Sequence, residues 1–236
     1  MTRTARLMAA LRRVFDLQAA SIWRDLASEL PAIRGVVLDV GSGAQPYRPL
    51  LSPEASYIAI DVADAGSNFG YEVADTIYFE GETWPVDSNS VDVILSTETL
   101  EHVRDPSTFL NEAQRCLRPG GRLLLTVPFA ARWHFIPHDY WRFTPSALKY
   151  LLERASFTDV RVYARGNAVT VSCYKLMAWM LPLLLPQSSR PTAQAGRLLG
   201  VLLVPLVLAA AAVGRLSLLG VGGEDCLGYT VLASKY

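Results

Sequence analysis

A short glycine-rich loop has the clearest chemical meaning in this 236-residue chain. The apolar run Gly35–Val40 leads directly into Gly41-Ser42-Gly43, a pattern that predicts a strand, a tight turn and the start of a helix. Glycine lets a backbone turn sharply and approach a ligand closely. The free N–H groups at a helix start attract anions and carboxylates. The loop therefore predicts a binding site for a small molecule, and the neighbouring acids indicate which one.

Three acids can complete a site for a nucleoside. Asp61 ends a second predicted strand, Tyr57–Asp61, where a carboxylate can accept both hydroxyls of a ribose. Glu80-Gly81 follows a third strand, where an acid and a free N–H can meet the edge of an adenine. Asp39 lies inside the first strand, and a buried carboxylate there needs donors from the loop or from a ligand's ammonium group. Two alternatives stay open: Asp61 as a turn residue and Glu80 as an exposed loop residue.

Nearly continuous apolar runs recur along the chain and predict strands buried on both faces of a parallel sheet. They are Gly35–Val40, Tyr57–Asp61, Asp75–Phe79, Val91–Ser96, Arg122–Val127, Phe157–Ala164 and residues 227–234. Helices are expected between them at Ser107–Leu117 and at Pro145–Ala155, the latter capped by Thr144. The crossover 62–74 leaves room for a short helix or none. Strands that alternate with helices indicate an open α/β sheet, and Pro119-Gly120-Gly121 predicts a turn before the fifth strand.

These motifs together resemble the class I S-adenosylmethionine-dependent methyltransferases of the small-molecule type found in bacteria. Leu38–Gly43 is similar to their first motif, Tyr57–Val62 carries what looks like their ribose acid, and Glu80–Pro85 looks like their adenine loop. The later motifs follow in the family's order: Asp87–Ile94, Thr97–Val103, Asp105-Pro106, Leu117–Leu123 and Val127–Phe129. Three positions depart from the pattern: Gln45-Pro46-Tyr47 replaces the third loop glycine, Glu80 replaces an Asp, and Trp84 replaces a leucine.

The resemblance implies a Rossmann-like, doubly wound α/β fold with helices on both faces. The implied sheet has seven strands in the order 3-2-1-4-5-7-6, with strand 7 antiparallel, and S-adenosylmethionine lies across the carboxyl ends of strands 1, 2 and 4. Residues 35–172 plus 223–236 would form this methyltransferase domain. The implied cofactor-binding residues are Asp39, Gly41, Ser42, Gly43, Asp61, Glu80, Gly81 and Ser96.

All three histidines follow strands four and five, in loops that face the cofactor in this family. His138 and His102 are therefore candidate bases for an acceptor that must lose a proton, although His102 can instead cap the next helix. The candidate substrate contacts are His134, Asp139, Tyr140 and Arg142. For His138, Asp139 and Arg142 the alternative is that they tie down their own loop. Because the sulfonium methyl group is already activated, the main task is to align the acceptor with it.

Charge and cysteine content limit the classes of binding partner that we expect. Residues 16–172 contain 13 basic and 20 acidic residues, so nucleic acid is a poor partner. Residues 1–15 and 173–222 contain bases but no acid, which favours an anionic membrane surface. The three cysteines are far apart without a Cys-x-x-Cys pair, so we expect no disulfide framework and no metal. The N-terminus lacks a signal-peptide pattern, which predicts a cytoplasmic protein, at the inner membrane face if it binds lipid.

Two segments flank the predicted domain. Residues 4–30 have helical spacing and Pro31 ends the pattern, so the segment 1–34 is predicted to form an amphipathic cover helix, with a membrane-surface helix as the alternative. Residues 173–222 form a hydrophobic helical insertion with two apolar blocks, Leu176–Leu185 and Leu198–Gly214, which Pro182 and Pro205 should kink. Three interpretations of this insertion stay open: a buried hairpin or homodimer interface, a monotopic or re-entrant membrane hairpin, and a two-span insertion.

The function that we expect is methyl transfer to a small or membrane-proximal acceptor. A hydroxyl of a lipid-linked or polysaccharide sugar is the first expectation, and a quinone or other lipid is the alternative within the class. A non-catalytic S-adenosylmethionine-binding scaffold protein and an NAD-dependent oxidoreductase are alternatives from other classes.

Overall fold

The computed structural model of the protein describes residues 15–184 and 200–236. The chain divides into two compact units. One comprises Trp23–Tyr163 with Gly228–Tyr236, and the other comprises the described parts of Met1–Ile22 and of Ala164–Leu227. We refer to them as the sheet unit and the hairpin unit and describe each by itself.

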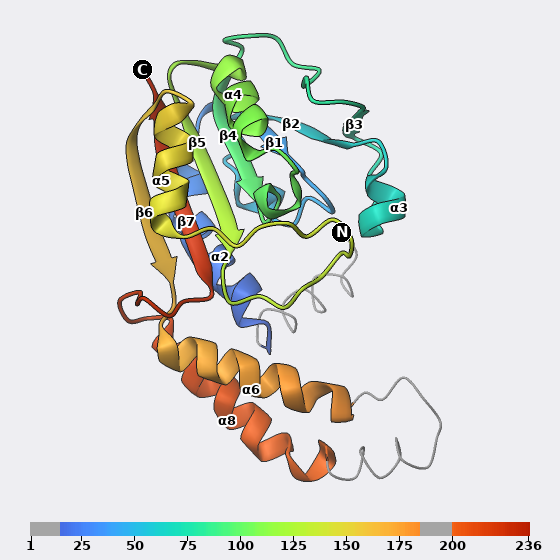
Figure 1. The fold of residues 1–236 in the computed structure, drawn as a ribbon, viewed down its shortest axis with the longest axis vertical. Helices are drawn as coiled ribbons and strands as arrows, with labels where there is room; N and C mark the ends of the chain where they lie inside the picture. Colours follow the sequence, from blue (N-terminus) through green and yellow to red (C-terminus); the bar gives the residue numbers. More distant parts are fainter. Residues whose placement is uncertain (1–14, 185–199) are drawn as a thin grey trace. The chain divides into compact units, whose positions relative to one another are not determined.

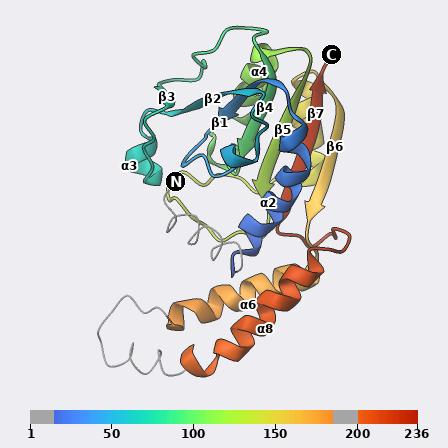
Figure 2. The ribbon, with the colours of Figure 1, turned by 180° about the vertical axis from the view of Figure 1, so that it is seen from behind.

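The sheet unit is built on one seven-stranded sheet (Figures 1 and 2) in the order β3-β2-β1-β4-β5-β7-β6. Its strands are β1 Gly35–Val40, β2 Ala55–Val62, β3 Thr76–Phe79, β4 Val91–Thr97, β5 Leu117–Pro128, β6 Phe157–Arg165 and β7 Gly228–Lys235. β1 pairs in parallel with β2 and with β4, whereas β7 pairs with β5 in the antiparallel direction. The predicted fold class, strand order and direction of the last strand are confirmed.

The middle of the sheet is buried on both faces, as the continuous apolar runs predicted. Adjacent residues whose side chains point to opposite faces, such as Val37 and Leu38 of β1 or Ile94 and Leu95 of β4, are all fully buried. Helices α4, Pro106–Cys116, and α5, Pro145–Arg154, cover one face. On the other face lies the Trp23–Glu29 part of α2, Leu17–Glu29, where Asp25 accepts a hydrogen bond of 2.7 Å from the hydroxyl of Thr230 in β7.

The helix ends follow local hydrogen bonding. Thr144 caps α5 as predicted, because its hydroxyl oxygen accepts from the amide of Ala147 at 3.2 Å. The cap of α4 is Asp105, whose carboxylate accepts from the amides of Ser107 and Thr108, so the interpretation of His102 as a cap is wrong. The short crossover after β2 contains only α3, Ala65–Phe69, as expected.

The predicted turn at Pro119-Gly120-Gly121 is also wrong. This segment lies inside β5, which begins at Leu117, and the pairing with β4 changes register between Val91 and Val93. Gly120 has a φ of +77°, a conformation that glycine adopts without strain. The positive φ therefore accommodates an irregularity inside one long strand, where the sequence pattern predicted a break.

Two apolar helices form the hairpin unit, α6 Ala168–Leu184 and α8 Val204–Ser217. Their buried core contains Leu17, Cys173, Met177, Met180, Val207, Ala210, Ala211, Leu218 and Leu227. Gly214 lets the helices pack closely, since a Cβ there would lie 2.5 Å from a methyl carbon of Leu17 and would force that side chain to shift. Pro205 occupies the first turn of α8, where proline is tolerated, so the kink expected there is absent from the described helix.

Much apolar surface of the hairpin unit remains exposed. Trp179, Leu216 and Leu219 are 66%, 68% and 80% exposed. Within residues 15–184 and 200–236, none of the helices combines the length and hydropathy that a membrane span needs. Residues 1–14, within the predicted N-terminal helix, and residues 185–199, within the predicted insertion, lie outside the described part of the chain.

Candidate active site

A cavity of about 360 Å³ opens in the sheet unit where β1 to β4 end. The backbone after β1 contributes Val40 and Gly41, and the end of β2 contributes Asp61. Gly81 follows β3, and Thr99 follows β4. Parallel strands present their carboxyl ends at one edge of a sheet, which is where ligands bind in open α/β folds. The cavity therefore lies where the sequence placed the cofactor.

The glycine loop and Asp61 form one hydrogen-bonded unit at this edge. The amides of Gly43 and Val62 donate to the two carboxylate oxygens of Asp61, at 2.9 Å and 2.8 Å. Burial raises the pKa of Asp61, and these two amides oppose the shift. Gly41 has a φ of +68°, and a Cβ there would lie 2.3 Å from the side chain of Thr99. Glycine is thus required at Gly41, and Asp61 is held in place with lone pairs left for a ligand.

Asp39 lies beneath the loop and does not line the cavity. Its carboxylate accepts a hydrogen bond of 2.6 Å from the hydroxyl of Tyr57, a donor on β2 that sequence reasoning did not find. The second oxygen, Oδ1, has no hydrogen-bond partner within the described residues. Burial raises the pKa of Asp39 to about 7, against the lowering effect of Tyr57.

The two predicted serines are buried near the loop rather than at the cavity wall. Ser96 donates to the carbonyl of Val40 at 3.0 Å, which joins the ends of β4 and β1. The hydroxyl of Ser42 is buried and has no hydrogen-bond partner in the described part of the chain. On the side where adenine was expected, Glu80 is exposed and is not among the lining residues, whereas Gly81 and Glu82 are.

Histidines and aromatic rings form a further part of the cavity wall, which we call the histidine end. His102 lies on the 3₁₀ helix η3, Leu100–His102, and lines the cavity together with His138 and Phe135. Nδ1 of His102 is 2.6 Å from the carbonyl oxygen of His138. Burial lowers the pKa of His102, so its ring is neutral near pH 7. Both candidate bases therefore face the cavity.

The loop that carries these residues is fixed to η3 and braced internally. The amides of Tyr140 and Trp141 both donate to the carbonyl oxygen of Glu101, at 2.9 Å and 3.2 Å. Asp139 accepts two hydrogen bonds from Arg142, at 2.6 Å and 2.8 Å, which lower its pKa although burial opposes the shift. Asp139 and Arg142 therefore brace their own loop, as the second interpretation of these residues expected. His134, Asp139, Tyr140 and Arg142 are not among the residues that line the cavity.

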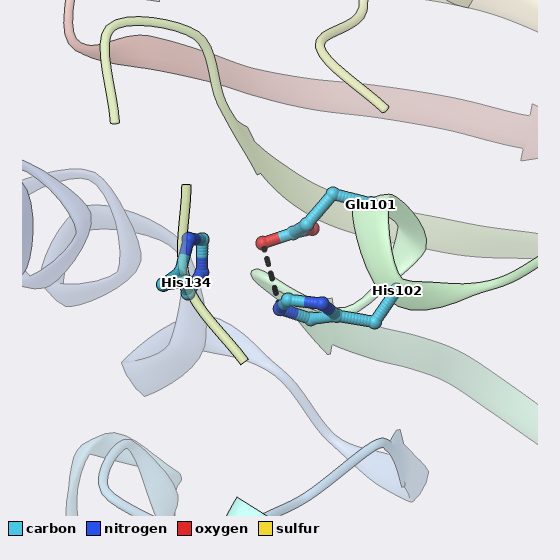
Figure 3. Close-up of side chains that lie close together, drawn as sticks. All are labelled: Glu101, His102 and His134. Carbon is cyan, nitrogen blue, oxygen red and sulfur yellow. Dashed lines mark ion pairs between the residues drawn. The ribbon is translucent and has the colours of Figure 1, made fainter. Parts of the chain in front are cut away.

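Glu101 is a residue that sequence reasoning missed. Its side chain is fully buried, and neither carboxylate oxygen has a hydrogen-bond partner within the described residues. Burial, followed by the negative charge of Glu98, raises its pKa well above the ordinary value. Figure 3 shows its carboxylate beside the rings of His102 and His134. The signal in the sequence was an acid directly before a histidine, inside a motif that we had assigned to the family as a whole.

The cavity wall is acidic, which limits the kind of ligand. Among the described residues, its charged lining consists of the guanidinium of Arg104 and the carboxylates of Asp61, Asp64, Glu82, Glu98 and Asp105. A cation is attracted to such a wall, and a pyrophosphate dianion is repelled. The electrostatics favour a sulfonium cofactor over a nicotinamide dinucleotide.

Comparison with known proteins agrees with this geometry. A family model described as a methyltransferase domain matches residues 6–162. The chain belongs to the class I S-adenosylmethionine-dependent methyltransferases. The resemblance stated from the motifs is thereby confirmed, and S-adenosylmethionine is the cofactor of the family.

Individual relatives of this methyltransferase are distant. A ubiquinone biosynthesis O-methyltransferase from Cereibacter sphaeroides is 29% identical over 174 residues, which cover 60% of this chain and 68% of that protein. An uncharacterized 37.1 kDa protein in transposon TN4556 of Streptomyces fradiae is 41% identical over 58 residues, 25% of this chain and only 16% of that protein. The solved structure of a SAM-dependent methyltransferase from Archaeoglobus fulgidus has a TM-score of 0.56 at 16% identity, covers 96% of this chain and 98% of its own, and shows a shared fold.

Replacement of Asp61 by alanine tests the ribose contact. We expect Asp61→Ala to weaken binding of S-adenosylhomocysteine at least tenfold, about 1.4 kcal/mol, because the ligand loses a charged acceptor and the Gly43 amide loses its partner. Isothermal titration calorimetry measures the dissociation constant. The matched control is Asp87→Ala, an exposed acid outside the cavity lining, which should leave affinity unchanged. Equal affinity of the Asp61→Ala variant and the unsubstituted protein would contradict the assignment.

Asp39 should make stability depend on pH. Its folded pKa of about 7 exceeds its ordinary value of 3.8, so between these values the folded protein binds a proton that the unfolded chain has released. The contribution of Asp39 to stability therefore falls as pH rises from about 4 to 7, by at most about 1.4 kcal/mol per pH unit.

Asp39→Asn removes this titration and still offers Tyr57 an acceptor. Urea unfolding of the cofactor-free protein measures the free energy of unfolding at several pH values. The free energy of unfolding of the Asp39→Asn variant should increase relative to that of the unsubstituted protein as pH rises to about 7. Asp87→Asn, the same substitution at an exposed position, serves as the control. A difference between the Asp39→Asn variant and the unsubstituted protein that does not change with pH would refute the prediction.

Proposed function

We propose that this protein transfers the methyl group of S-adenosylmethionine to a hydroxyl oxygen of a small or membrane-proximal acceptor. The observation that carries the proposal is that one cavity is lined both by Gly41 and Asp61 and, at its histidine end, by His102 and His138. The glycine and the acid suit the cofactor, and the histidine end offers nitrogen bases and aromatic rings to an acceptor.

The proposed reaction is a single in-line displacement. The acceptor oxygen forms a bond to the methyl carbon while the carbon–sulfur bond breaks and its electron pair returns to sulfur, which leaves neutral S-adenosylhomocysteine. The proton of the hydroxyl passes to a base at the histidine end. Most of the work of the protein is to hold oxygen, carbon and sulfur in line.

His138 and His102 are the two proposed bases. Both line the cavity, and the ring of each lies near Phe69, with centroids 6.1 Å and 5.5 Å from that of the phenylalanine. His102 is held by the carbonyl of His138, so that its Nε2 is the nitrogen left to take a proton. The ring of His138 is the freer of the two candidates to meet an acceptor, since its own backbone provides the contacts to Phe135 and His102.

For the acceptor we propose a lipid-linked or polysaccharide sugar, with a quinone or other lipid as the second candidate. Rings of Phe69, Tyr71 and Phe135 border the histidine end, and flat aromatic faces suit the apolar face of a sugar ring as well as a quinone. The ubiquinone O-methyltransferase named among the relatives supports the second candidate. The exposed apolar surface of the hairpin unit supports an acceptor that is attached to lipid in both cases.

The catalytic proposal predicts a loss of turnover on substitution of His138. The assay follows tritiated methyl transfer from S-adenosylmethionine to octyl glucoside and, separately, to a ubiquinol-type hydroquinone. We expect His138→Asn to lower kcat at least 100-fold on the accepted probe with S-adenosylhomocysteine affinity within twofold. Lys149→Ala, on the exposed surface of α5, is the control and should retain full activity.

The same assay separates the other functions. Full turnover by the His138→Asn variant would show that His138 is not the base. Cofactor binding without transfer to either probe or to a total membrane extract would favour a non-catalytic scaffold protein. Selective binding of NADH over S-adenosylhomocysteine would favour an oxidoreductase.

We further propose that the hairpin unit contacts an anionic membrane surface, at the cytoplasmic face. The exposed apolar side chains of α6, α8 and the following segment lie in a stretch, 173–222, without any acid, and anionic lipid attracts such a surface. A homodimer interface is the competing use of the same side chains. We also propose the domain boundaries that the motifs suggest. They are a cover segment at residues 1–34 and a methyltransferase domain at residues 35–172 plus 223–236.

Membrane contact predicts co-sedimentation with lipid vesicles. The full chain should pellet with vesicles that contain phosphatidylglycerol. The triple variant Trp179→Ser, Leu216→Ser, Leu219→Ser should stay in the supernatant, because it lacks the apolar side chains that the lipid would bury. The control replaces two exposed apolar residues of the sheet unit, Ile77→Ser and Tyr150→Ser, and should still pellet. Equal sedimentation of the triple variant, or a dimer that dissociates on this substitution, would overturn the membrane proposal.

A further inference from the structure

We propose that Glu101, His102 and His134 form a binding site for a divalent transition-metal ion beside the acceptor. One ligand atom from each of the three side chains lies within 4.8 Å of the others. Figure 3 shows that Glu101 and His102 project from one short helical turn, while the ring of His134 approaches from the loop that faces them. Ligand atoms about 2.1 Å from one ion lie roughly 3.4 Å apart in a tetrahedral site, so the three side chains would have to close in by a small rotation on binding.

The buried carboxylate of Glu101 supplies an independent observation. This side chain is fully buried, and both of its oxygens lack a hydrogen-bond partner within the described residues. A buried carboxyl group without donors is costly unless a charge or a proton compensates it. Oε1 of Glu101 lies 3.7 Å from Nε2 of His102, which is too long for a hydrogen bond. A bound cation would compensate the charge of this carboxylate.

The two histidines are held so that each offers a nitrogen lone pair. Nδ1 of His102 is 2.6 Å from the carbonyl oxygen of His138, and Nδ1 of His134 is 2.8 Å from the carbonyl oxygen of Arg132. A carbonyl oxygen can only accept, so Nδ1 carries the proton in both rings and Nε2 is free to bind a metal. Metal-binding histidines are commonly oriented in this way by a carbonyl or a carboxylate.

A second acid strengthens the orientation of His134. Nδ1 of this ring is 3.2 Å from a carboxylate oxygen of Asp139, which also accepts the His134 amide at 3.0 Å. Asp139 is in turn held by Arg142. The residues that we had predicted as substrate contacts thereby acquire a specific task, which is to hold the ring of a metal ligand.

The donor set indicates which ions fit. Two imidazole nitrogens with one carboxylate suit Zn²⁺, Fe²⁺ or Mn²⁺, whereas Ca²⁺ and Mg²⁺ prefer oxygen ligands throughout. Three protein ligands leave coordination positions for water or substrate. The cysteine pattern predicted no metal, and this site contains no cysteine, which is why that argument could not find it.

The proposed site deepens the proposed function and rests on it for its role. His102 lines the cavity, so an ion bound there would meet the acceptor hydroxyl and lower the pKa of that hydroxyl. With Nε2 of His102 bound to the ion, His138 is the remaining base. The acceptor class that this arrangement favours is a hydroxyl with a second oxygen on the neighbouring carbon, which can chelate the ion.

Metal binding can be measured without any methyl transfer. The full chain is treated with a chelator, dialysed and titrated with Zn²⁺ by calorimetry, and Co²⁺ is used in parallel because its visible absorption reports coordination by imidazole. We expect one Zn²⁺ per chain, and a dissociation constant at least 100-fold larger in both the Glu101→Gln and the His134→Asn variants. The control is Glu153→Gln, an exposed acid on α5, which should bind as the unsubstituted protein does.

Each outcome decides the proposal. Stoichiometric binding that both variants lose, with the Co²⁺ spectrum lost as well, supports the site. Absence of binding in the folded protein, or equal affinity in both variants, overturns it and identifies any bound ion as adventitious. If Glu101→Gln does not fold by circular dichroism, His134→Asn decides alone, since its side chain is partly exposed in a loop. Binding of S-adenosylhomocysteine in the same samples reports separately on the proposed function.

Discussion

Parallel pairing of β1 between β2 and β4 is the constraint on which the site depends. Asp39 of β1 is paired with Ala59 of β2 on one side and with Leu95 of β4 on the other. Because the three strands run in the same direction, the chain must leave all of them at one edge. The glycine loop, Asp61 and the turn that carries Glu101 and His102 are therefore neighbours in space although they are far apart in the sequence. The cavity is a direct result of that pairing.

The sequence predicted this frame well because burial on both faces leaves a strong pattern. Strand β1 was predicted to the residue, and the other strands to within a few residues, apart from the early start of β5. Positive φ at Gly120 was the exception, since a glycine beside a proline suits a turn and an irregular strand equally. Local signals also sufficed for the cap at Thr144. At α4 the cap is Asp105, three residues after His102, because its carboxylate accepts hydrogen bonds from two helix amides.

Contacts between distant segments were not predictable in the same way. Tyr57 as the donor to Asp39 depends on the register of two strands, and Glu101 beside His134 depends on how a loop folds back. An acid next to a histidine occurs in many sequences, and its meaning here comes from complete burial without donors. The hairpin helices show the same limit, because apolar composition predicted α6 and α8 without deciding what covers their exposed side chains. Both helices lie beyond residue 162, where the match to the family model ends.

The acidic wall of the cavity has a consequence for the order of events in a catalytic cycle. The cofactor arrives with a positive sulfur and leaves as a thioether without that charge, whereas the carboxylates of Asp61, Glu82 and Glu98 stay in place. The wall carboxylates therefore attract the sulfonium of the arriving cofactor, and methyl transfer removes the positive charge on which this attraction depends. The electrostatic attraction of the wall is therefore weaker for the spent cofactor than for the fresh one. Added salt would screen this difference and bring the two affinities closer together.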